Sequence, residues 1–288
     1  MQIGAESLIA FLRLARAVLR SASRPLPLGA SGAVSSQRRP VQLGRTAIHL
    51  VTLGPQGGRL VWVNVHENER TSVQAATALM QEAGWPDRLL LLRAQGQRHV
   101  VFWLGWRPHA FDPNRIFTDD GIVATLRRHA SDSPRARQAL IALRDAILAE
   151  IGSATPSAVV ALHNNGRGHY DIASYLPGAA LAREAADVHV AAGADPGDFV
   201  LVTQPAAYKQ LAHGDFGVVL MGRCAPDDGS MAHAFLNRPT PAYFNVEARY
   251  GHGVQQLAML RRVRALALQR HDAAAPSGRV ADTFKLLP

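Results

Sequence analysis

The chain has 288 residues, of which 48% are apolar and 18% are charged. This composition is typical of a globular protein, and the length is sufficient for one large α/β domain or two small ones. The single cysteine, Cys224, excludes an intramolecular disulfide and a cysteine-rich structural zinc site. The net charge is +9, but the arginines are scattered and form no basic run interleaved with aromatic residues, so we expect no nucleic-acid partner.

Residues 1–42 are expected to form an N-terminal helix and a flexible connector. Residues 7–19 are apolar with a period near 3.6, but Arg13 and Arg16 interrupt them, which fits a signal peptide poorly. Residues 21–42 are rich in Ser, Pro, Gly, Ala and Arg, as connectors are. No run approaches the roughly 18 apolar residues of a membrane span. We therefore expect a cytoplasmic protein without a membrane span.

Strand and helix patterns alternate from residue 43 onward, which predicts a single α/β domain over residues 43–271. We expect a mixed, mostly parallel central sheet with helices on both faces, and a flexible tail over residues 272–288. The first two strands, joined by a Gly-rich turn, predict a hairpin, and residues 105–121 predict a loop. The expected strands are 47–53, 59–65, 89–93, 99–104, 158–162, 199–203, 217–221 and 243–247, and the expected helices are 71–83, 134–151 and 254–269.

Three of the expected strands end at side chains that can carry chemistry. His66 follows the strand over 59–65, His163 follows the apolar run over 158–162, and Glu247 ends the strand over 243–247. In open α/β sheets, ligands bind at the carboxyl ends of the strands. The coincidence of three such ends predicts a functional site there.

His66 and Glu69 are three positions apart directly after a strand, so both side chains can converge on one cation. Hydrolytic zinc sites use three protein ligands drawn from His and carboxylate and leave one position for water. His163 is the natural third ligand, and spacing alone leaves Glu67 open as an alternative. A surface turn with an exposed histidine is the competing interpretation. Zinc is the preferred ion, one per chain, although cobalt and manganese accept similar ligands.

The order of four short motifs resembles the zinc carboxypeptidase superfamily, and within it the aspartoacylase and succinylglutamate desuccinylase branch. These motifs are His66-Glu67-Asn68-Glu69, Asp112-Pro113-Asn114-Arg115-Ile116-Phe117, Ala161-Leu162-His163-Asn164-Asn165 and Asn245-Val246-Glu247. The resemblance covers roughly residues 45 to 270. The sequence departs from the branch at Glu67, where a glycine is usual, at Asn164-Asn165, and around Glu247.

The resemblance implies a role for each matching residue. Glu247 would act as general base and then general acid, and Arg107 would stabilise the oxyanion, with Arg98 as the alternative. Asn114 and Arg115 would bind a substrate carboxylate, which suits the planar fork of a guanidinium.

Other polar residues near the motifs are candidates for the pocket wall. Asn165, Tyr243 and Tyr250 are expected to line it, and His252 is a candidate to orient Glu247, although packing and hydrogen bonding explain such residues equally well.

The sequence therefore predicts a zinc-dependent hydrolase that cleaves an amide bond in a carboxylate-bearing small molecule or peptide. An N-acyl amino acid, a peptide C-terminus and a cell-wall fragment all remain open as substrates, with a slight preference for small acidic amides. Two alternatives are a catalytically inactive carboxylate- or peptide-binding protein of the same fold and, on net charge alone, a nucleic-acid-binding protein. The oligomeric state is left open.

Overall fold

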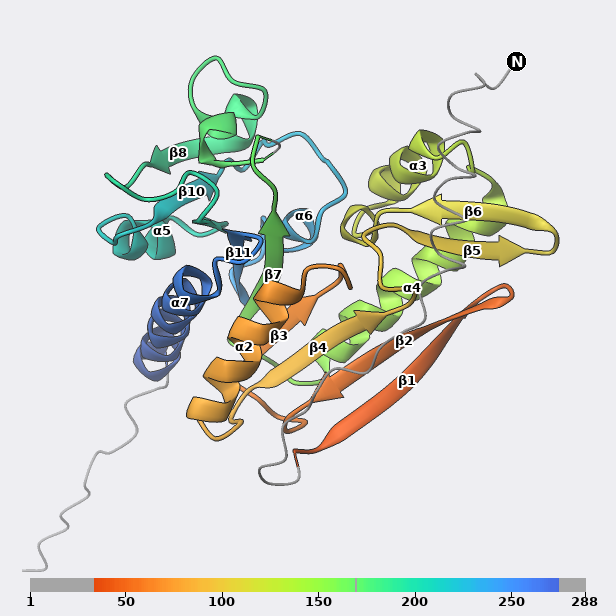
Figure 1. Cartoon of the computed structure of the whole chain (residues 1–288), viewed down its shortest axis with the longest axis horizontal. Helices are drawn as coiled ribbons and strands as arrows, with labels where there is room; N and C mark the ends of the chain where they lie inside the picture. Colours follow the sequence, from red (N-terminus) through yellow and green to blue (C-terminus); the bar gives the residue numbers. More distant parts are fainter. Residues whose placement is uncertain (1–33, 169, 275–288) are drawn as a thin grey trace, which may run out of the picture.

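A computed structural model describes residues 34–168 and 170–274 (Figure 1). The helix expected over residues 7–19 and the tail beyond residue 274 lie outside the described residues. Within them the chain forms a single α/β domain around one large mixed sheet, as the sequence predicts.

Nine strands of the described residues form this sheet, in the order β1-β2-β4-β3-β7-β11-β9-β10-β8. The four central strands β4, β3, β7 and β11 run parallel, and β1, β2 and β9 pair antiparallel with their inner neighbours. Beyond β9, β10 pairs parallel with β9, and β8 pairs antiparallel with β10. The strands are β1 (Ser36–Leu43), β2 (Thr46–Leu53), β3 (Leu60–Asn64), β4 (Arg88–Arg93), β7 (Ala158–Asn165), β8 (Ala185–His189), β9 (Phe199–Val202), β10 (Gly217–Met221) and β11 (Ala242–Arg249).

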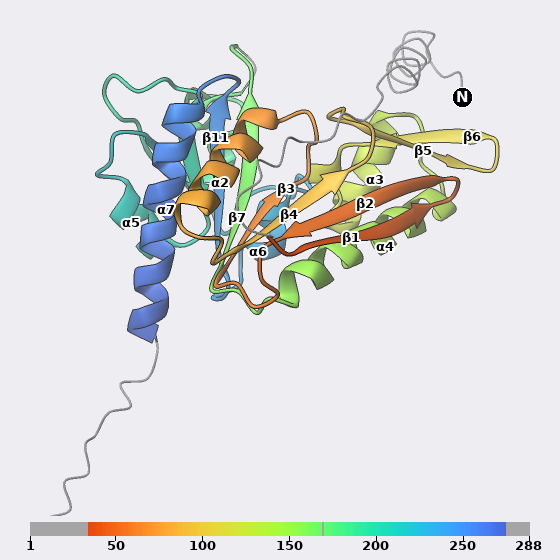
Figure 2. The same ribbon diagram turned by 60° about the horizontal axis from the view of Figure 1, so that its bottom comes forward.

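Helices cover both faces of the sheet, which confirms the predicted layering (Figures 1 and 2). The helices α2 and α7 pack side by side on one face, over a core that includes Trp62, Phe244 and Leu260. On the other face a second core includes Leu140 of α4 and Phe235 of α6. The helices are α2 (Arg70–Glu82), α3 (Asp119–Arg128), α4 (Pro134–Gly152), α5 (Pro205–Leu211), α6 (Met231–Phe235) and α7 (Gly253–Ala274), with short 3₁₀ turns η1 (Pro113–Arg115), η2 (Ile172–Tyr175) and η3 (Ala182–Glu184).

The hairpin predicted from the first two expected strands is wrong, because β4 inserts between β2 and β3. The partner of β2 is instead β1, across the turn at Gly44, whose φ of 57° favours glycine. Residues 36–42, expected in the flexible connector, therefore belong to the sheet. The prediction failed because β1 is largely exposed and rich in Arg and Gln, so it carries almost no apolar signal.

The loop predicted over residues 105–121 is also wrong in part. It contains β6 (Arg107–Phe111), which pairs with β5 (Val100–Leu104) in a separate two-stranded sheet, then η1 and the start of α3. Thr118 caps α3 through the Gly121 amide, and the few apolar residues of this helix hide its period in the sequence. At the other end of the chain, α7 continues to Ala274, past the expected end of the domain at residue 271.

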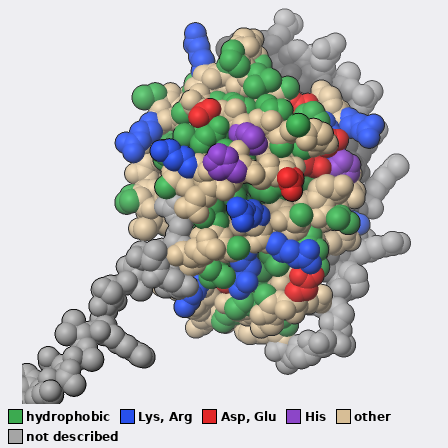
Figure 3. Space-filling model, turned by 90° about the vertical axis from the view of Figure 1, so that its left-hand side faces the viewer, with side chains coloured by type: hydrophobic (Ala, Val, Ile, Leu, Met, Phe, Trp, Pro, Cys, Tyr) green, Lys and Arg blue, Asp and Glu red, His purple; other side chains and the backbone are tan. Residues whose placement is uncertain are grey.

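The outer surface carries no concentration of positive charge on the side formed by α5 and α7. Figure 3 shows Lys and Arg side chains there dispersed among apolar and neutral ones, with acidic side chains between them. Among the described residues, no helix combines the length and apolar content that crossing a membrane requires.

Candidate metal centre

The sheet topology brings three of the sequence-predicted side chains to one edge. His66 lies two residues beyond the end of β3, and His163 lies near the end of β7, the neighbouring parallel strand. Glu247 of β11 is directly opposite His163 in the strand register. Each of the three side chains is buried, at 0%, 3% and 6% exposed respectively. Parallel strands end at the same sheet edge, which explains this meeting of residues distant in sequence.

His66, Glu69 and His163 form a buried group whose possible ligand atoms all lie within 4.8 Å of one another. The Nδ1 atom of His66 is 2.8 Å from Glu69 Oε1, and Nδ1 of His163 is 2.9 Å from Glu69 Oε2. Glu69 is fully buried immediately before α2, so its carboxylate is held between the two imidazoles. The structure thus brings together the three residues expected to bind a metal.

Asp112 fixes the orientation of His66 from behind. Its Oδ1 accepts a hydrogen bond from His66 Nε2 at 2.7 Å and another from the Asn114 amide at 2.9 Å. With its Nε2 proton donated to this carboxylate, His66 turns Nδ1 toward Glu69 and His163. Such a carboxylate behind a ligating histidine is a common feature of metal centres. Asp112 lies in one of the four sequence motifs, but its role depends on the contact with His66, which only the fold shows.

The pKa values of His66 and Glu69 are shifted by the charges around them. Burial lowers the pKa of His66, but the Glu69 and Asp112 carboxylates outweigh burial and raise that pKa to about 9. Burial likewise raises the pKa of Glu69, but His66 and His163 outweigh it and lower that pKa to about 2. The cluster thus holds a positive charge at His66, where a bound cation would otherwise balance the two carboxylates.

The donor atoms fit a zinc ion. His66 Nδ1 faces Glu69 Oε1 across 2.8 Å, and His163 Nε2 is buried without a hydrogen-bond partner among the described residues. A buried nitrogen without a hydrogen bond is unfavourable unless another partner, such as a cation, satisfies it. Two imidazole nitrogens and one carboxylate are the ligand set of many hydrolytic zinc centres.

Arg98 occupies the position in which Arg107 was expected. The Nη1 atom of Arg98 is 2.7 Å from Glu69 Oε1, and its Nη2 is 3.5 Å from Asp112 Oδ2. Arg107 is exposed at the turn between β5 and β6, and five residues of extended strand, roughly 16 Å, separate it from Asp112. The structure therefore does not bring Arg107 to the cluster.

Glu247 has a buried carboxylate with only weak hydrogen-bond donors around it. Asn165 Nδ2 and Asn245 Nδ2 donate to it at 3.3 and 3.4 Å. Burial raises the pKa of Glu247, and His163 opposes this shift only in part. A raised pKa makes this carboxylate a stronger proton acceptor than an exposed glutamate. Asn165 is thus in contact with this carboxylate, as well as with the Gly197 carbonyl at 2.8 Å.

Asn114 and Arg115 follow Asp112 in η1. The Asn114 side chain is engaged with the protein, since its Oδ1 accepts a hydrogen bond from the Met231 amide at 3.2 Å. Arg115 Nη1 forms an ion pair of 2.7 Å with Asp228 Oδ2.

Tyr243, another expected pocket residue, is 2% exposed and stacks on Phe235. Burial first, and then Glu247, raise the pKa of Tyr243, which lies within the electrostatic reach of Arg115.

Three further candidates have structural partners. Glu67, the alternative ligand, accepts hydrogen bonds from the Ala94 and Gly96 amides at 2.8 and 2.6 Å, so its carboxylate is directed away from the cluster. The Tyr250 hydroxyl accepts a hydrogen bond from Asn68 at 2.7 Å. His252 Nδ1 pairs with Asp198 Oδ2 at 2.8 Å, and this ion pair orients its ring.

A network behind the site is centred on Asn164, which the sequence marks only as unusual. Asn164 Oδ1 accepts a hydrogen bond from the Ser72 amide of α2, and its Nδ2 donates to Ala248 O of β11 and to Gln256 of α7. Gln256 Nε2 in turn donates to His163 O. The network therefore connects the segments that carry Glu69, His163 and Glu247.

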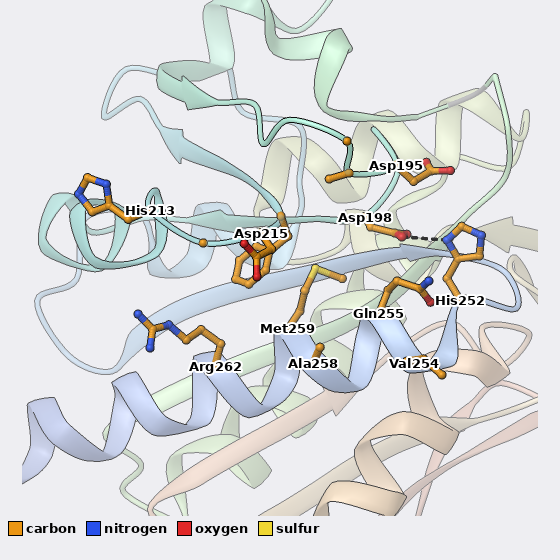
Figure 4. Close-up of a pocket in the computed structure, with 14 residues that line it drawn as sticks. Asp195, Asp198, His213, Asp215, His252, Val254, Gln255, Ala258, Met259 and Arg262 are labelled. Carbon is orange, nitrogen blue, oxygen red and sulfur yellow. Dashed lines mark hydrogen bonds and ion pairs between the residues drawn. The ribbon is translucent and has the colours of Figure 1, made fainter.

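A pocket of 820 Å³ lies on the other side of α7 and is distinct from the cluster (Figure 4). Met259 and Arg262 of α7 contribute to its wall together with the Asp198–His252 pair. Neither the three candidate ligands nor Glu247 line this pocket.

Comparisons with known proteins give no match by sequence. No protein-family model matches the chain, and no curated protein does. Three solved structures have a partly similar fold. A succinylglutamate desuccinylase from Chromobacterium violaceum is 17% identical with a TM-score of 0.43, over 89% of this chain and 76% of that chain. An aspartoacylase family protein from Mesorhizobium loti is 12% identical with a TM-score of 0.36, over 82% of this chain and 70% of that chain. A candidate metallopeptidase from Shewanella denitrificans is 12% identical with a TM-score of 0.40, over 91% and 90%.

The names of the first two structures are those of the branch that the sequence motifs resemble. All three TM-scores lie below 0.5, so the functional assignment depends on the geometry of the site and on the motifs.

Proposed function

We propose that the chain is a zinc-dependent hydrolase that cleaves an amide bond in a carboxylate-bearing substrate, of the N-acyl amino acid deacylase or carboxypeptidase type. One observation supports this proposal above all others. A fully buried His66–Glu69–His163 group lies beside a buried carboxylate, Glu247, at the carboxyl edge of a parallel sheet. The convergence of two imidazoles and a carboxylate in one buried group, with a further buried carboxylate beside them, favours a resident metal ion.

In this proposal His66, Glu69 and His163 hold the ion through two nitrogens and a carboxylate oxygen. Zinc, when bound, supplies Lewis acidity that polarises the scissile carbonyl and acidifies water. Glu247 accepts the proton of the attacking water on a carboxylate oxygen and then delivers it to the leaving amine nitrogen. Its raised pKa suits both halves of this transfer.

The remaining polar side chains bind and orient the substrate. Arg98, whose Nη1 is 2.7 Å from Glu69 Oε1, contacts the cluster and would stabilise the developing oxyanion, the role expected of Arg107. Arg115 holds the substrate carboxylate, and Asn114 fixes the loop that carries Met231. Asn165 orients Glu247 through its amide, and Tyr243 forms an apolar wall near that carboxylate.

The test is a hydrolysis assay of the zinc-loaded and the chelator-treated protein against N-acyl amino acids and peptides with free C-termini. We expect release of the free amino acid from one of these two sets, loss of turnover after chelation, and recovery when zinc is returned. Binding of carboxylate ligands without turnover in the zinc-loaded protein would instead favour an inactive binding protein of this fold.

A further inference from the structure

The loop that carries Arg98 depends on side chains for its position. Residues 94–99 connect β4 to β5 and form neither helix nor strand. Gln95 ties this loop to β5, because its Oε1 accepts a hydrogen bond from the Val101 amide at 3.0 Å and its Nε2 donates to Val101 O at 2.6 Å. Gly96 adopts a φ of 70°, which favours glycine. Pairing of the kind found in strands therefore does not set the position of Arg98.

Glu67 holds the same loop from the side of the metal cluster. Its side chain is half-buried, and its Oε2 accepts hydrogen bonds from the Ala94 amide at 2.8 Å and from the Gly96 amide at 2.6 Å. Hydrogen bonds to a carboxylate are charge-assisted and stronger than those between neutral groups. The Glu67 carboxylate thus fixes the backbone two residues before Arg98.

The contacts between these two segments close a ring. Glu67 lies two residues before Glu69, and Gly96 lies two residues before Arg98. Glu67 Oε2 joins the segments at Gly96, and Arg98 Nη1 joins them again, 2.7 Å from Glu69 Oε1. The segment 66–69 is itself a tight turn, in which the Glu69 amide donates to His66 O at 3.1 Å. A displacement of the Arg98 backbone from the candidate metal ligands therefore has to strain or break the hydrogen bonds to Glu67.

The Arg98 side chain needs this support, because its ion pairs alone hold it weakly. Its contact with Asp112 is long, at 3.5 Å, and 43% of the side chain is exposed. A long side chain loses rotamer entropy when it is fixed in one place, and water screens ion pairs of such exposure. A fixed backbone limits the positions that the guanidinium can reach and so favours its contact with Glu69.

We propose that Glu67 is a positioning residue for Arg98, whose carboxylate holds the loop over residues 94–99 so that the guanidinium stays at the metal cluster. Glu67 acts through the loop backbone and touches neither the proposed ion nor the substrate. The proposal rests on the proposed function only in the role that it gives Arg98 in the reaction.

Two kinds of substitution separate the hydrogen bonds from the charge. Because both amides use one oxygen, the single carbonyl oxygen in Glu67→Gln can accept both hydrogen bonds, whereas Glu67→Ala and Glu67→Ser remove them. Phenylglyoxal modifies guanidinium groups, so its rate of reaction with the metal-free, full-length protein measures how firmly Arg98 is held. Mass spectrometry of the digested protein gives this rate relative to that of the exposed Arg107, which is the internal standard. We expect Arg98 to react at least about threefold faster in Glu67→Ala and Glu67→Ser than in the wild type and Glu67→Gln.

Turnover of the zinc-loaded protein tests the consequence for the reaction. We expect kcat to fall by about 10- to 100-fold in Glu67→Ala, with a smaller change in KM, and to recover largely in Glu67→Gln, since a displaced guanidinium is badly oriented. In an Arg98→Ala background, Glu67→Ala should change kcat by no more than about twofold, because Glu67 acts through Arg98. Glu82→Ala, which removes an exposed carboxylate paired with Arg261, is the control and should change neither readout. Thermal unfolding checks that each variant is folded.

Equal reactivity of Arg98 in the wild type, Glu67→Ala and Glu67→Ser would overturn the inference, as would an Arg98 that reacts as fast in Glu67→Gln as in Glu67→Ala. An undiminished effect of Glu67→Ala on kcat in the Arg98→Ala background would also overturn it. If Arg98 is protected only when residue 67 can accept the hydrogen bonds but the zinc-loaded protein hydrolyses no amide, the proposed function fails while the positioning of Arg98 by Glu67 stands.

Discussion

The buried ionisable residues around His66 determine how the site holds protons as well as a cation. Glu69 and Asp112 both contact this imidazole, from opposite sides of the ring. Without a metal, the Arg98 guanidinium and a protonated His66 balance the two buried carboxylates. A bound cation would replace that proton, so protonation and metal binding compete at one nitrogen.

This competition predicts a pH-dependent stability of the metal-free protein. Because the pKa of His66 is raised from 6.5 to about 9 in the folded state, the stabilisation is complete below pH 6.5 and is lost as the pH rises toward 9. Thermal unfolding of the chelator-treated protein should therefore show a melting temperature that falls between pH 6.5 and 9. In His66→Ala the fall should be smaller, and an identical fall in both proteins would contradict this account of the site.

Glu247 is expected to act in the reaction without binding the metal. Substitution Glu247→Gln keeps the size of the side chain but removes the proton acceptor, so turnover should fall by about 10²- to 10⁴-fold. Zinc content and KM should stay near the wild-type values, because the three proposed ligands are intact. If zinc is lost together with activity, Glu247 is a ligand or a structural residue and not the base.

Arg98 and Arg107 provide a paired comparison. Arg98 contacts Glu69 and Asp112, while Arg107 is exposed at the β5–β6 turn. We expect Arg98→Ala to lower kcat by about 10²- to 10³-fold, since the substitution removes the cation to which the proposal assigns oxyanion stabilisation. Arg107→Ala should leave steady-state kinetics unchanged. The reverse result would show that Arg107, the residue that the resemblance implies, is the functional arginine and that Arg98 has only a structural role.

At the scale of elements, the site depends on how α2, β7, β11 and α7 are fixed to one another. Asn164 connects all four through hydrogen bonds to Ser72, Ala248 and Gln256, and Gln256 extends the connection to His163 O. The parallel register of β7 and β11 places His163 and Glu247 directly opposite each other. The side-chain network adds the position of α2, and hence of Glu69.

Substitution Asn164→Asp tests this role. It keeps an oxygen for the Ser72 amide but places a carboxylate against two oxygen acceptors, so we expect a destabilisation of about 1–3 kcal/mol. Zinc affinity should fall with it, measured by competition with a chromogenic chelator at a temperature where the protein stays folded. The exposed Asn237→Asp is the matched control. Unaltered zinc affinity in a destabilised Asn164→Asp protein would limit this residue to a structural role.

The sequence predicted those elements whose packing leaves a periodic signal. The apolar run of β7 and the stripe of α7 were both found, because each buries a continuous set of apolar residues. The β2–β3 hairpin was wrong because strand order depends on long-range pairing, which local turn residues do not report. The strand β1 and the helix α3 leave no such signal, because β1 is exposed and α3 has few apolar residues.

The same distinction applies to the site. His66, Glu69 and His163 were predictable because each follows or precedes an element with a clear pattern, and the fold brings them together. Asp112, Arg98 and Glu67 acquire their roles only through contacts between segments far apart in sequence. The resemblance implies Arg107, but the β5–β6 hairpin places this residue at an exposed turn away from the cluster.

In the molecule as a whole, the sheet separates two hydrophobic cores and leaves the cluster at one of its edges. The cores on both faces consist of apolar residues that extend along the whole sheet and its helices, including Trp62 on one face and Leu140 on the other. The metal-free chain therefore has the means to stay folded, and loss of metal binding in a variant need not signify loss of the fold. In a variant that stays folded, the metal content therefore reports directly on the integrity of the proposed metal site.

The decisive measurement is the zinc content of the purified protein after dialysis against zinc, by elemental analysis, for the wild type and for His66→Ala and His163→Ala. Circular dichroism confirms that each protein is folded. The account predicts about one tightly bound zinc ion per wild-type chain, because the group offers three protein ligands, and a large loss in both variants. A wild-type protein that retains no zinc, or variants that retain as much as the wild type, would contradict it.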